Sequence, residues 1–318
     1  MASPDNGQHA LLTGADGFVA SHILSILLEA DDILKTHPSW KGKVKFAIVS
    51  NFTSQQPFDE LTENTKGSAV PLTYVIHAAS PLKFNVKDTQ KEMIEPAVMG
   101  TAEILKGAHR HGGTTLKRFV LLSSAVSVPN SFEDITREGR PYTEKDWNLI
   151  TLDRSDTVLG YTVSKTQAEQ TAWECMKTDR PNFDLTVINP DIITGPMMRP
   201  ISGPDSINET NHSADREFHR WNPQGSRGRA IPTLSLCTFP SFTIDVDVRD
   251  VARSHVGALT NPAAGGQRIL LISGLITPQL VVNIIRSHFP EVKDRVSEGN
   301  PSRILPDGIQ SMIDQNAL

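Results

Sequence analysis

Short apolar runs alternate with amphipathic stretches along the first part of the chain. The apolar runs are typical of buried strands and cover residues 10–12, 74–81, 118–124 and 185–188. Helical patterns lie between or after them, at residues 23–28, 95–106 and 166–175. This alternation predicts an α/β fold in which helices cover both faces of a doubly wound parallel sheet.

The turn after the first strand is rich in small residues. It reads Thr13-Gly14-Ala15-Asp16-Gly17-Phe18-Val19-Ala20, and a helix follows. Between a strand and a helix, such a turn is typical of a dinucleotide phosphate site. Gly14 permits the tight turn, Gly17 lets the backbone approach a pyrophosphate, and the helix N-terminus offers free N–H groups. The alternative is an ordinary strand-to-helix turn.

The pattern changes after residue 196. Residues 197–241 are rich in Pro, Ser, Asn, Gly and Arg, and they show little periodicity over a length that exceeds an ordinary connection. Regular patterns return at 242–274, and an amphipathic helix is predicted from Thr277 to Phe289. We therefore expect a dinucleotide-binding Rossmann domain over residues 1–196 with a return segment at 242–274. Residues 197–241 and 275–318 are expected to form a small substrate-binding or lid region.

Composition excludes several classes of function. The net charge is −5 and the pI is near 6.1, which argues against a nucleic-acid partner. No apolar run approaches the ~20 residues that span a bilayer, and the polar start of the chain has no secretory pattern. Two cysteines form no disulfide framework and no metal cluster. We expect a cytoplasmic protein without a metal, either a monomer or a homodimer.

A Tyr-x-x-x-Lys pattern carries the candidate chemistry. Tyr161 and Lys165 would share one face of a helix, so that an ammonium lies near a phenol. A nearby positive charge favours the phenolate, which predicts a lowered pKa for Tyr161 and a better proton shuttle. Ser124 ends the strand at 118–124, at the edge where an open α/β sheet binds its ligands. Alone, the pattern is more often a surface feature of an amphipathic helix.

Together these segments resemble a known family, the extended short-chain dehydrogenase/reductases. Within it, they are most similar to the NADPH-dependent aldehyde and ketone reductases related to dihydroflavonol 4-reductase and methylglyoxal reductase. The resemblance covers most of residues 11–258. The segments that carry it, in family order, are TGADGFVASHI, VIHAASP, PAVMGTAEILK, RFVLLSSA, YTVSKTQAEQTAWE, INPDIITGP and DVDVRDVARSHV.

The resemblance implies roles for individual residues. It places the catalytic triad on Ser124, Tyr161 and Lys165, with Tyr161 and Lys165 also contacting the cofactor. The implied phosphate-binding residues are Gly14, Asp16, Gly17, Phe18 and Val19. The implied contacts near the adenine are Asn51 and Phe52, and those near the nicotinamide are Ala78, Ser80 and Pro190 to Ile193.

The implied activity is the NADPH-dependent reduction of a small aldehyde or ketone to an alcohol. Tyr161 would act as general acid, Ser124 would hold the carbonyl oxygen, and Lys165 would ease ionisation of Tyr161. Two alternatives stay open. One is a nucleotide-binding scaffold or sensor that has lost tight cofactor binding. The other is an epimerase or dehydratase, because a fold does not fix a reaction.

The chain departs from the family in the segment after the first helix. The family's second strand, with the Arg-bearing turn after it, is missing from the pattern, and the next predicted strand, residues 44–50, ends at Asn51 and Phe52 without a carboxylate. The family's C-terminal strand and helix are also not seen before Leu318. We therefore expect NADPH to bind weakly, with a reduced preference over NADH.

Overall fold

A computed structural model gives the fold of most of the chain. It describes residues 9–27, 48–49, 59, 72–80, 86–129, 142–150, 157–198, 201, 207–208, 210–211, 243–296, 298–302 and 304. The strands are β1 (His9–Thr13), β2 (Leu72–His77), β3 (Arg118–Leu122), β4 (Asp184–Pro190), β5 (Ile192–Thr194), β6 (Thr243–Asp247), β7 (Arg268–Leu271) and β8 (Gly274–Ile276). The α-helices are α1 (Phe18–Leu27), α3 (Glu95–His111), α4 (Thr157–Asp179), α6 (Val248–Thr260) and α7 (Pro278–His288). The short helical turns are η2 (Gln90–Ile94), η3 (Ala125–Ser127), η5 (Pro262–Ala264) and η6 (Pro290–Arg295).

The main sheet is parallel throughout its described strands. Their order is β1-β2-β3-β4-β7, and each neighbouring pair is parallel. The carboxyl ends of all five strands therefore lie along one edge of the sheet. In an open α/β sheet this edge is where ligands bind.

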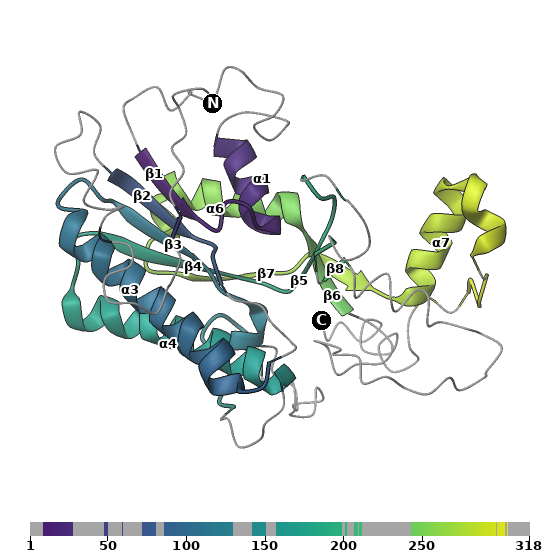
Figure 1. The fold of residues 1–318 in the computed structure, drawn as a ribbon. Helices are drawn as coiled ribbons and strands as arrows, with labels where there is room; N and C mark the ends of the chain where they lie inside the picture. The colour runs from purple at the N-terminus through teal and green to yellow at the C-terminus, as the bar shows by residue number, and fades with distance from the viewer. Residues whose placement is uncertain are drawn as a thin grey trace.

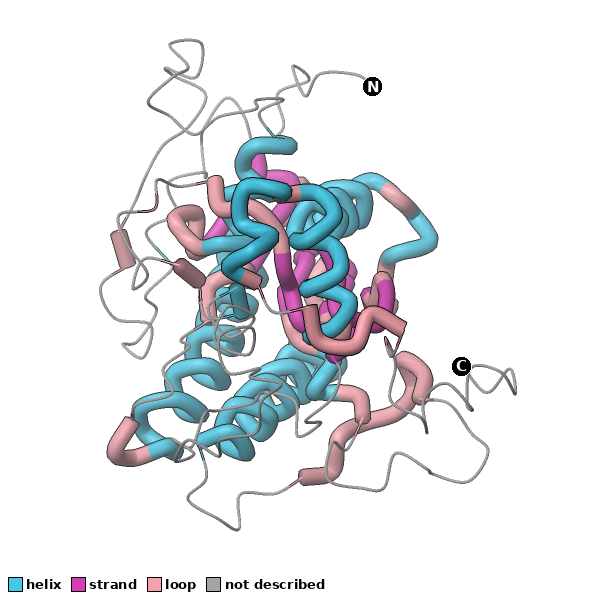
Figure 2. Tube along the Cα trace, turned by 90° about the vertical axis from the view of Figure 1, so that its right-hand side faces the viewer, coloured by secondary structure: helices cyan, strands magenta, loops and turns pink. Residues whose placement is uncertain are grey.

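Helices cover the two faces of this sheet (Figure 1; Figure 2). Helices α3 and α4 pack on one face, where Val75 and Phe119 belong to the apolar core. Helices α1 and α6 pack on the other face, where the core includes Ile76, Val120 and Ile188. Neighbouring residues of β2 and β3 thus enter opposite layers, as the twofold period of a strand requires. This confirms the expected Rossmann-type α/β fold.

A second, smaller sheet was not predicted. Strands β5, β6 and β8 form it, with β5 parallel and β8 antiparallel to β6. Strands β5 and β8 have only three residues each, which is too short for periodicity to be visible in the sequence. The sheet extends the fold beyond the carboxyl edge of the main sheet (Figure 1).

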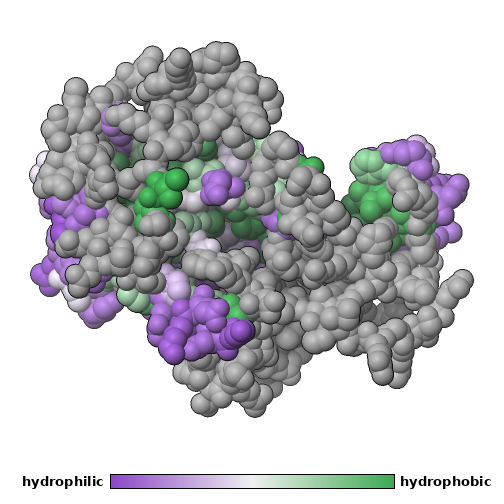
Figure 3. All heavy atoms as spheres, in the orientation of Figure 1, coloured by the Kyte–Doolittle hydropathy of each residue, from purple (hydrophilic) through white to green (hydrophobic). Residues whose placement is uncertain are grey.

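The predicted amphipathic helix near the C-terminal end is present as α7. Val282 is buried, whereas Ile284 and the following Phe289 are about half exposed. Figure 3 shows apolar and hydrophilic side chains on different sides of the lobe that carries α7. Among the helices described, none is both long and apolar enough to cross a membrane.

The departure predicted after the first helix falls outside the described residues. Residues 28–47 and 50–58 are not described, so the missing second strand, Asn51 and Phe52 stay predictions. Of the strand predicted at 44–50, only Ile48 and Val49 are described, and neither lies in a strand. Most of the stretch at 197–241 is likewise outside the described part of the chain.

Candidate active site

The glycine-rich turn has the shape of a phosphate cradle. Gly14 has a φ of +70°, which is a left-handed conformation, and a Cβ built on it would lie 3.0 Å from the Ala79 Cα. The Gly17 N–H donates to the Gly14 carbonyl at 2.8 Å, and α1 begins at the next residue, Phe18. The first N–H groups of a helix have no partner within the helix. The turn therefore brings a bare backbone and free N–H groups together, which fits a pyrophosphate group.

The end of β2 lies beside this turn. Thr13 at the end of β1 hydrogen bonds through Oγ1 to His77 Nδ1 at 2.8 Å, and the same oxygen accepts from the Ala79 N–H at 3.1 Å. Ala78 and Ser80 follow β2 and are partly buried. Both candidate nicotinamide-side residues therefore lie at the carboxyl edge, next to the cradle.

His77, the last residue of β2, is a packed histidine. Its side chain is buried, and its ring lies 6.3 Å from that of Phe119. Burial, together with the positive charge of Lys165, lowers the pKa of His77 to about 3. Such a group is neutral at physiological pH and is a poor base.

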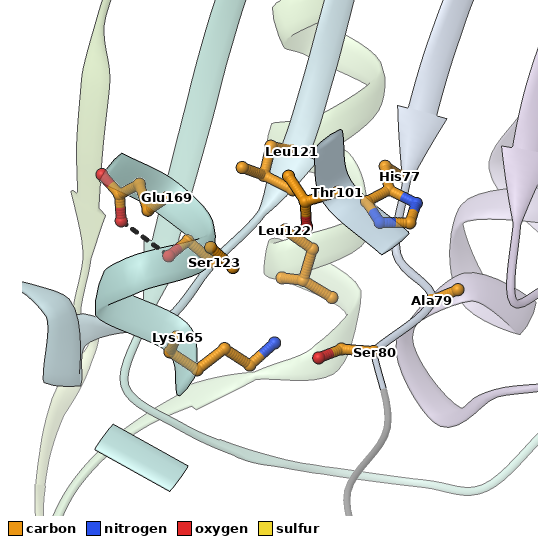
Figure 4. A pocket seen from close by; sticks show the side chains of 10 residues that line it. His77, Ala79, Ser80, Thr101, Leu121, Leu122, Ser123, Lys165 and Glu169 are labelled. Atoms are coloured by element: carbon orange, nitrogen blue, oxygen red, sulfur yellow. Dashed lines mark hydrogen bonds between the residues drawn. The ribbon is translucent and has the colours of Figure 1, made fainter. Parts of the chain in front are cut away.

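The three residues of the predicted triad come together at the same edge. Ser124 follows β3, and Tyr161 and Lys165 lie one turn apart on α4. The side chains of Ser124 and Tyr161 are hydrogen bonded. The Lys165 Nζ lies 6.0 Å from the centre of the Tyr161 ring, and Figure 4 shows this ammonium extending toward Ser80. The side chains of Ser124, Tyr161 and Lys165 therefore lie close to one another in the fold.

The predicted direction of the Tyr161 pKa is wrong for this structure. Burial raises the pKa of the phenol above its usual range, the hydrogen bond from Ser124 lowers it in part, and the negative charge of Asp191 raises it. The same burial lowers the pKa of Lys165 to about 8, against the opposing effect of Glu169. Desolvation of the site, which a sequence pattern does not display, is the largest cause of the pKa shift of both groups.

The other candidate residues near the nicotinamide, Pro190 and Ile193, lie where β4 passes into β5. Pro190 ends β4 and pairs with Leu271 of β7, and Ile193 lies in the middle of β5. Between them, Asp191 accepts a hydrogen bond from the Ile192 N–H at 2.9 Å. Burial raises the pKa of Asp191 to about 6, with a further contribution from the charge of Asp245.

Comparison with known proteins places this arrangement in a family. The family described as "Male sterility protein" matches residues 54–215. A ketoreductase from Aspergillus niger is 32% identical, and the alignment covers 94% of this chain and 88% of the relative. An uncharacterized oxidoreductase from Schizosaccharomyces pombe is 31% identical over 92% of this chain and 86% of the relative. The chain belongs to the extended short-chain dehydrogenase/reductases.

Solved structures agree with this family membership. The yeast methylglyoxal/isovaleraldehyde reductase complexed with NADPH has a TM-score of 0.73 and 26% identity, covering 92% of this chain and 86% of the yeast protein. Vestitone reductase from alfalfa has a TM-score of 0.63 at 23% identity, which shows the shared fold. The expected resemblance is confirmed, and with it the assignment to the oxidoreductases.

Two acidic residues of the site were missed by the sequence reasoning. Glu169 lies one turn after Lys165 on α4 and is fully buried. With Lys165, Ser123, Ser80 and His77 it lines a small cavity (Figure 4). Asp191 lies within the predicted segment 190–193, but no role was given to its carboxylate. Spacing alone could have indicated Glu169, because it continues the i, i+4 series of Tyr161 and Lys165.

Proposed function

We propose that this protein reduces small aldehydes or ketones to alcohols with NADPH as the hydride donor. One observation carries the proposal: the hydrogen-bonded pair of Ser124 and Tyr161 lies at the carboxyl edge of the sheet, with Lys165 one turn away. A scaffold or sensor would not need these three groups together. The names of relatives agree with this activity, since a Candida albicans protein at 29% identity is a putative NADPH-dependent methylglyoxal reductase.

The cofactor would lie along the carboxyl edge of the sheet. The turn from Gly14 to Gly17 and the start of α1 would hold the pyrophosphate, and Ala78, Ser80 and Ile193 would lie near the nicotinamide. NADPH, when bound, supplies the hydride that is added to the carbonyl carbon. The protein's task is to place the two reactants and to provide for the charge that develops on the oxygen.

Tyr161 would donate the proton to the developing alkoxide. Burial raises the pKa of Tyr161, so the phenol keeps its proton at neutral pH and is in the form that a general acid requires. The Ser124 hydroxyl, already bonded to Tyr161, would hold the same substrate oxygen. The charged form of Lys165, with a pKa of about 8, would stabilise the phenolate that remains after proton transfer.

The direct test is a reaction with the purified full chain. NADPH would be mixed with a panel of small aldehydes and ketones, and both nicotinamide oxidation and the alcohol product would be measured. We expect equal amounts of NADP⁺ and alcohol. Binding of NADPH, seen as a change in nicotinamide fluorescence, without turnover of any carbonyl would instead favour the sensor.

A further inference from the structure

The carboxylate of Glu169 is the centre of a buried polar network. Glu169 lies on α4, and its side chain is fully buried. Oε2 accepts from the Ser123 Oγ at 2.6 Å and from the Asn189 Nδ2 at 2.7 Å, and Oε1 accepts from the Arg268 Nε at 2.5 Å. Ser123 directly follows β3, Asn189 lies near the end of β4 and Arg268 begins β7, so one carboxylate joins the triad helix to three strands of the sheet. Figure 4 shows the contact of Glu169 with Ser123.

All three partners of Glu169 are donors. Two acceptor oxygens match this set, whereas an amide at the same position would turn an NH₂ group toward one of the donors. Arg268 supplies the opposite charge and is itself almost buried. It also donates to the Asp146 carbonyl at 2.5 Å and lies 3.7 Å from the centre of the Trp147 ring. The network therefore includes the segment 142–150 as well.

Asn189 connects this network to Ser124, just after β3. Its Nδ2 has two hydrogens, and it donates to Glu169 at 2.7 Å and to the Ser124 carbonyl at 3.1 Å. The neighbouring Ser123 is held by Glu169 through its hydroxyl and by the Ile188 carbonyl through its N–H. Glu169 therefore holds the Ser123 side chain directly and the Ser124 carbonyl through Asn189, next to the backbone hydrogen bond from Ser123 to β4.

We propose that Glu169 is a positioning residue for carbonyl reduction: through Asn189 and Ser123 it holds the Ser124 hydroxyl against Tyr161. The inference rests on the proposed function, because it assigns Glu169 a role in the reaction of that site. Tyr161, Lys165 and Glu169 follow one another at four-residue spacing on α4. The same helix face therefore carries the proton donor and the group that sets the distance to the serine.

A purely structural ion pair would behave differently from a positioning residue. Loss of a structural pair lowers stability and leaves the rate of the folded enzyme unchanged. Loss of a positioning residue lowers kcat in the folded enzyme, because a misplacement of about 1 Å can cost about 10²-fold in rate. The hydrogen bonds of Glu169 go to Ser123, Asn189 and Arg268, none of which is assigned to the cofactor, so the affinity for NADPH should change little.

The experiment compares Glu169→Gln with Ser124→Ala and with the double variant. We expect Glu169→Gln to lower kcat about 10²-fold, with the NADPH Kd unchanged. In the Ser124→Ala background the same change should lower kcat by no more than about threefold, because residues that act through one another are not additive. Asn189→Ala removes the link between Glu169 and the Ser124 carbonyl but leaves the ion pair of Glu169 with Arg268, and it should lower kcat by a similar factor. This variant tests the inference if Glu169→Gln does not fold.

A matched control lies at the other end of the same strands. Asp184 at the start of β4 accepts from the Arg118 Nε of β3 at 2.5 Å. Asp184→Asn removes a carboxylate from an ion pair that joins β3 to β4, at the opposite end of β4 from Asn189. This variant should have the kcat of the wild type. A wild-type kcat in Glu169→Gln or Asn189→Ala, or equal losses with and without Ser124, would overturn the inference. A wild-type kcat in Ser124→Ala would overturn the proposed function as well, so the two failures can be told apart.

Discussion

Adding one methyl group at Gly160 should slow the enzyme, because this residue immediately precedes Tyr161 on α4. Gly160 is buried where α4 packs against the start of η2. A Cβ built on it would overlap the Cγ2 methyl of Thr89, whereas the next atom, the Thr89 Cβ, would lie at 3.5 Å. The substitution Gly160→Ala therefore displaces either the helix or Thr89.

The magnitude follows from two opposing effects. Overpacking of a core costs about 1–3 kcal/mol. Replacement of glycine by alanine inside a helix contributes about 1 kcal/mol in the other direction. We expect the free energy of unfolding to fall by up to about 2 kcal/mol. If α4 moves by about 1 Å, Tyr161 moves with it, and kcat should fall by about 10²-fold.

The assay measures urea unfolding and kcat for three variants. The double variant Gly160→Ala with Thr89→Ser lacks the overlapping methyl, so it should regain both stability and rate. Gly257→Ala in α6 is the control, because nothing lies within 4 Å of its added Cβ, and it should be slightly stabilised. Failure of Thr89→Ser to restore the rate, or a fully active Gly160→Ala, would refute the packing argument.

Three further predictions concern the cradle and the titrating groups. Gly14→Ala should weaken NADPH binding in fluorescence titrations and lower stability by about 1–2 kcal/mol, since φ is +70° and the Ala79 backbone is 3.0 Å away. Asp191→Asn should lower the pKa of the Tyr161 phenol, which is followed by its ultraviolet absorbance in an alkaline titration with Tyr161→Phe as the reference. The Asp191 charge, present above its pKa of about 6, adds to the burial that raises the pKa of Tyr161. The free energy of unfolding should decrease as the pH falls below 6.5, because burial lowers the pKa of His77 to about 3 and that of His255 to about 4, so both take up protons on unfolding. His255→Leu should flatten this slope in urea titrations.

The sequence was sufficient for the main sheet and its helices. The central strands β2, β3 and β4 are buried almost throughout, so each appears as a continuous apolar run. The helices between the strands have the length and pattern of crossovers. The closeness of Tyr161, Lys165 and Ser124 was also predictable, because Tyr161 and Lys165 have helical spacing and Ser124 lies just after a strand. Their roles as a triad were implied by the family resemblance and stay a prediction. The small sheet of β5, β6 and β8 was not predictable, since its partners are short and far apart in the chain.

The electrostatics of the site could not be predicted from spacing. The contact of Arg268 with Glu169 joins residues that are 99 positions apart, and no local pattern indicates such a pair. The direction of the Tyr161 pKa depends on how deeply the phenol is buried, which is a property of the packed site. A helix pattern predicts the neighbours of Tyr161 on α4 but not Ser124 and Asp191, which follow β3 and β4.

The central claim, that Tyr161 is the proton donor of a carbonyl reductase, is tested most directly by Tyr161→Phe. The substitution removes one hydroxyl and keeps the ring. NADPH binding and turnover of the best carbonyl substrate would be measured on the same preparation. The claim predicts an NADPH Kd close to that of the wild type and a kcat lower by about 10²- to 10⁴-fold. A variant that binds NADPH and turns over at the wild-type rate would contradict it.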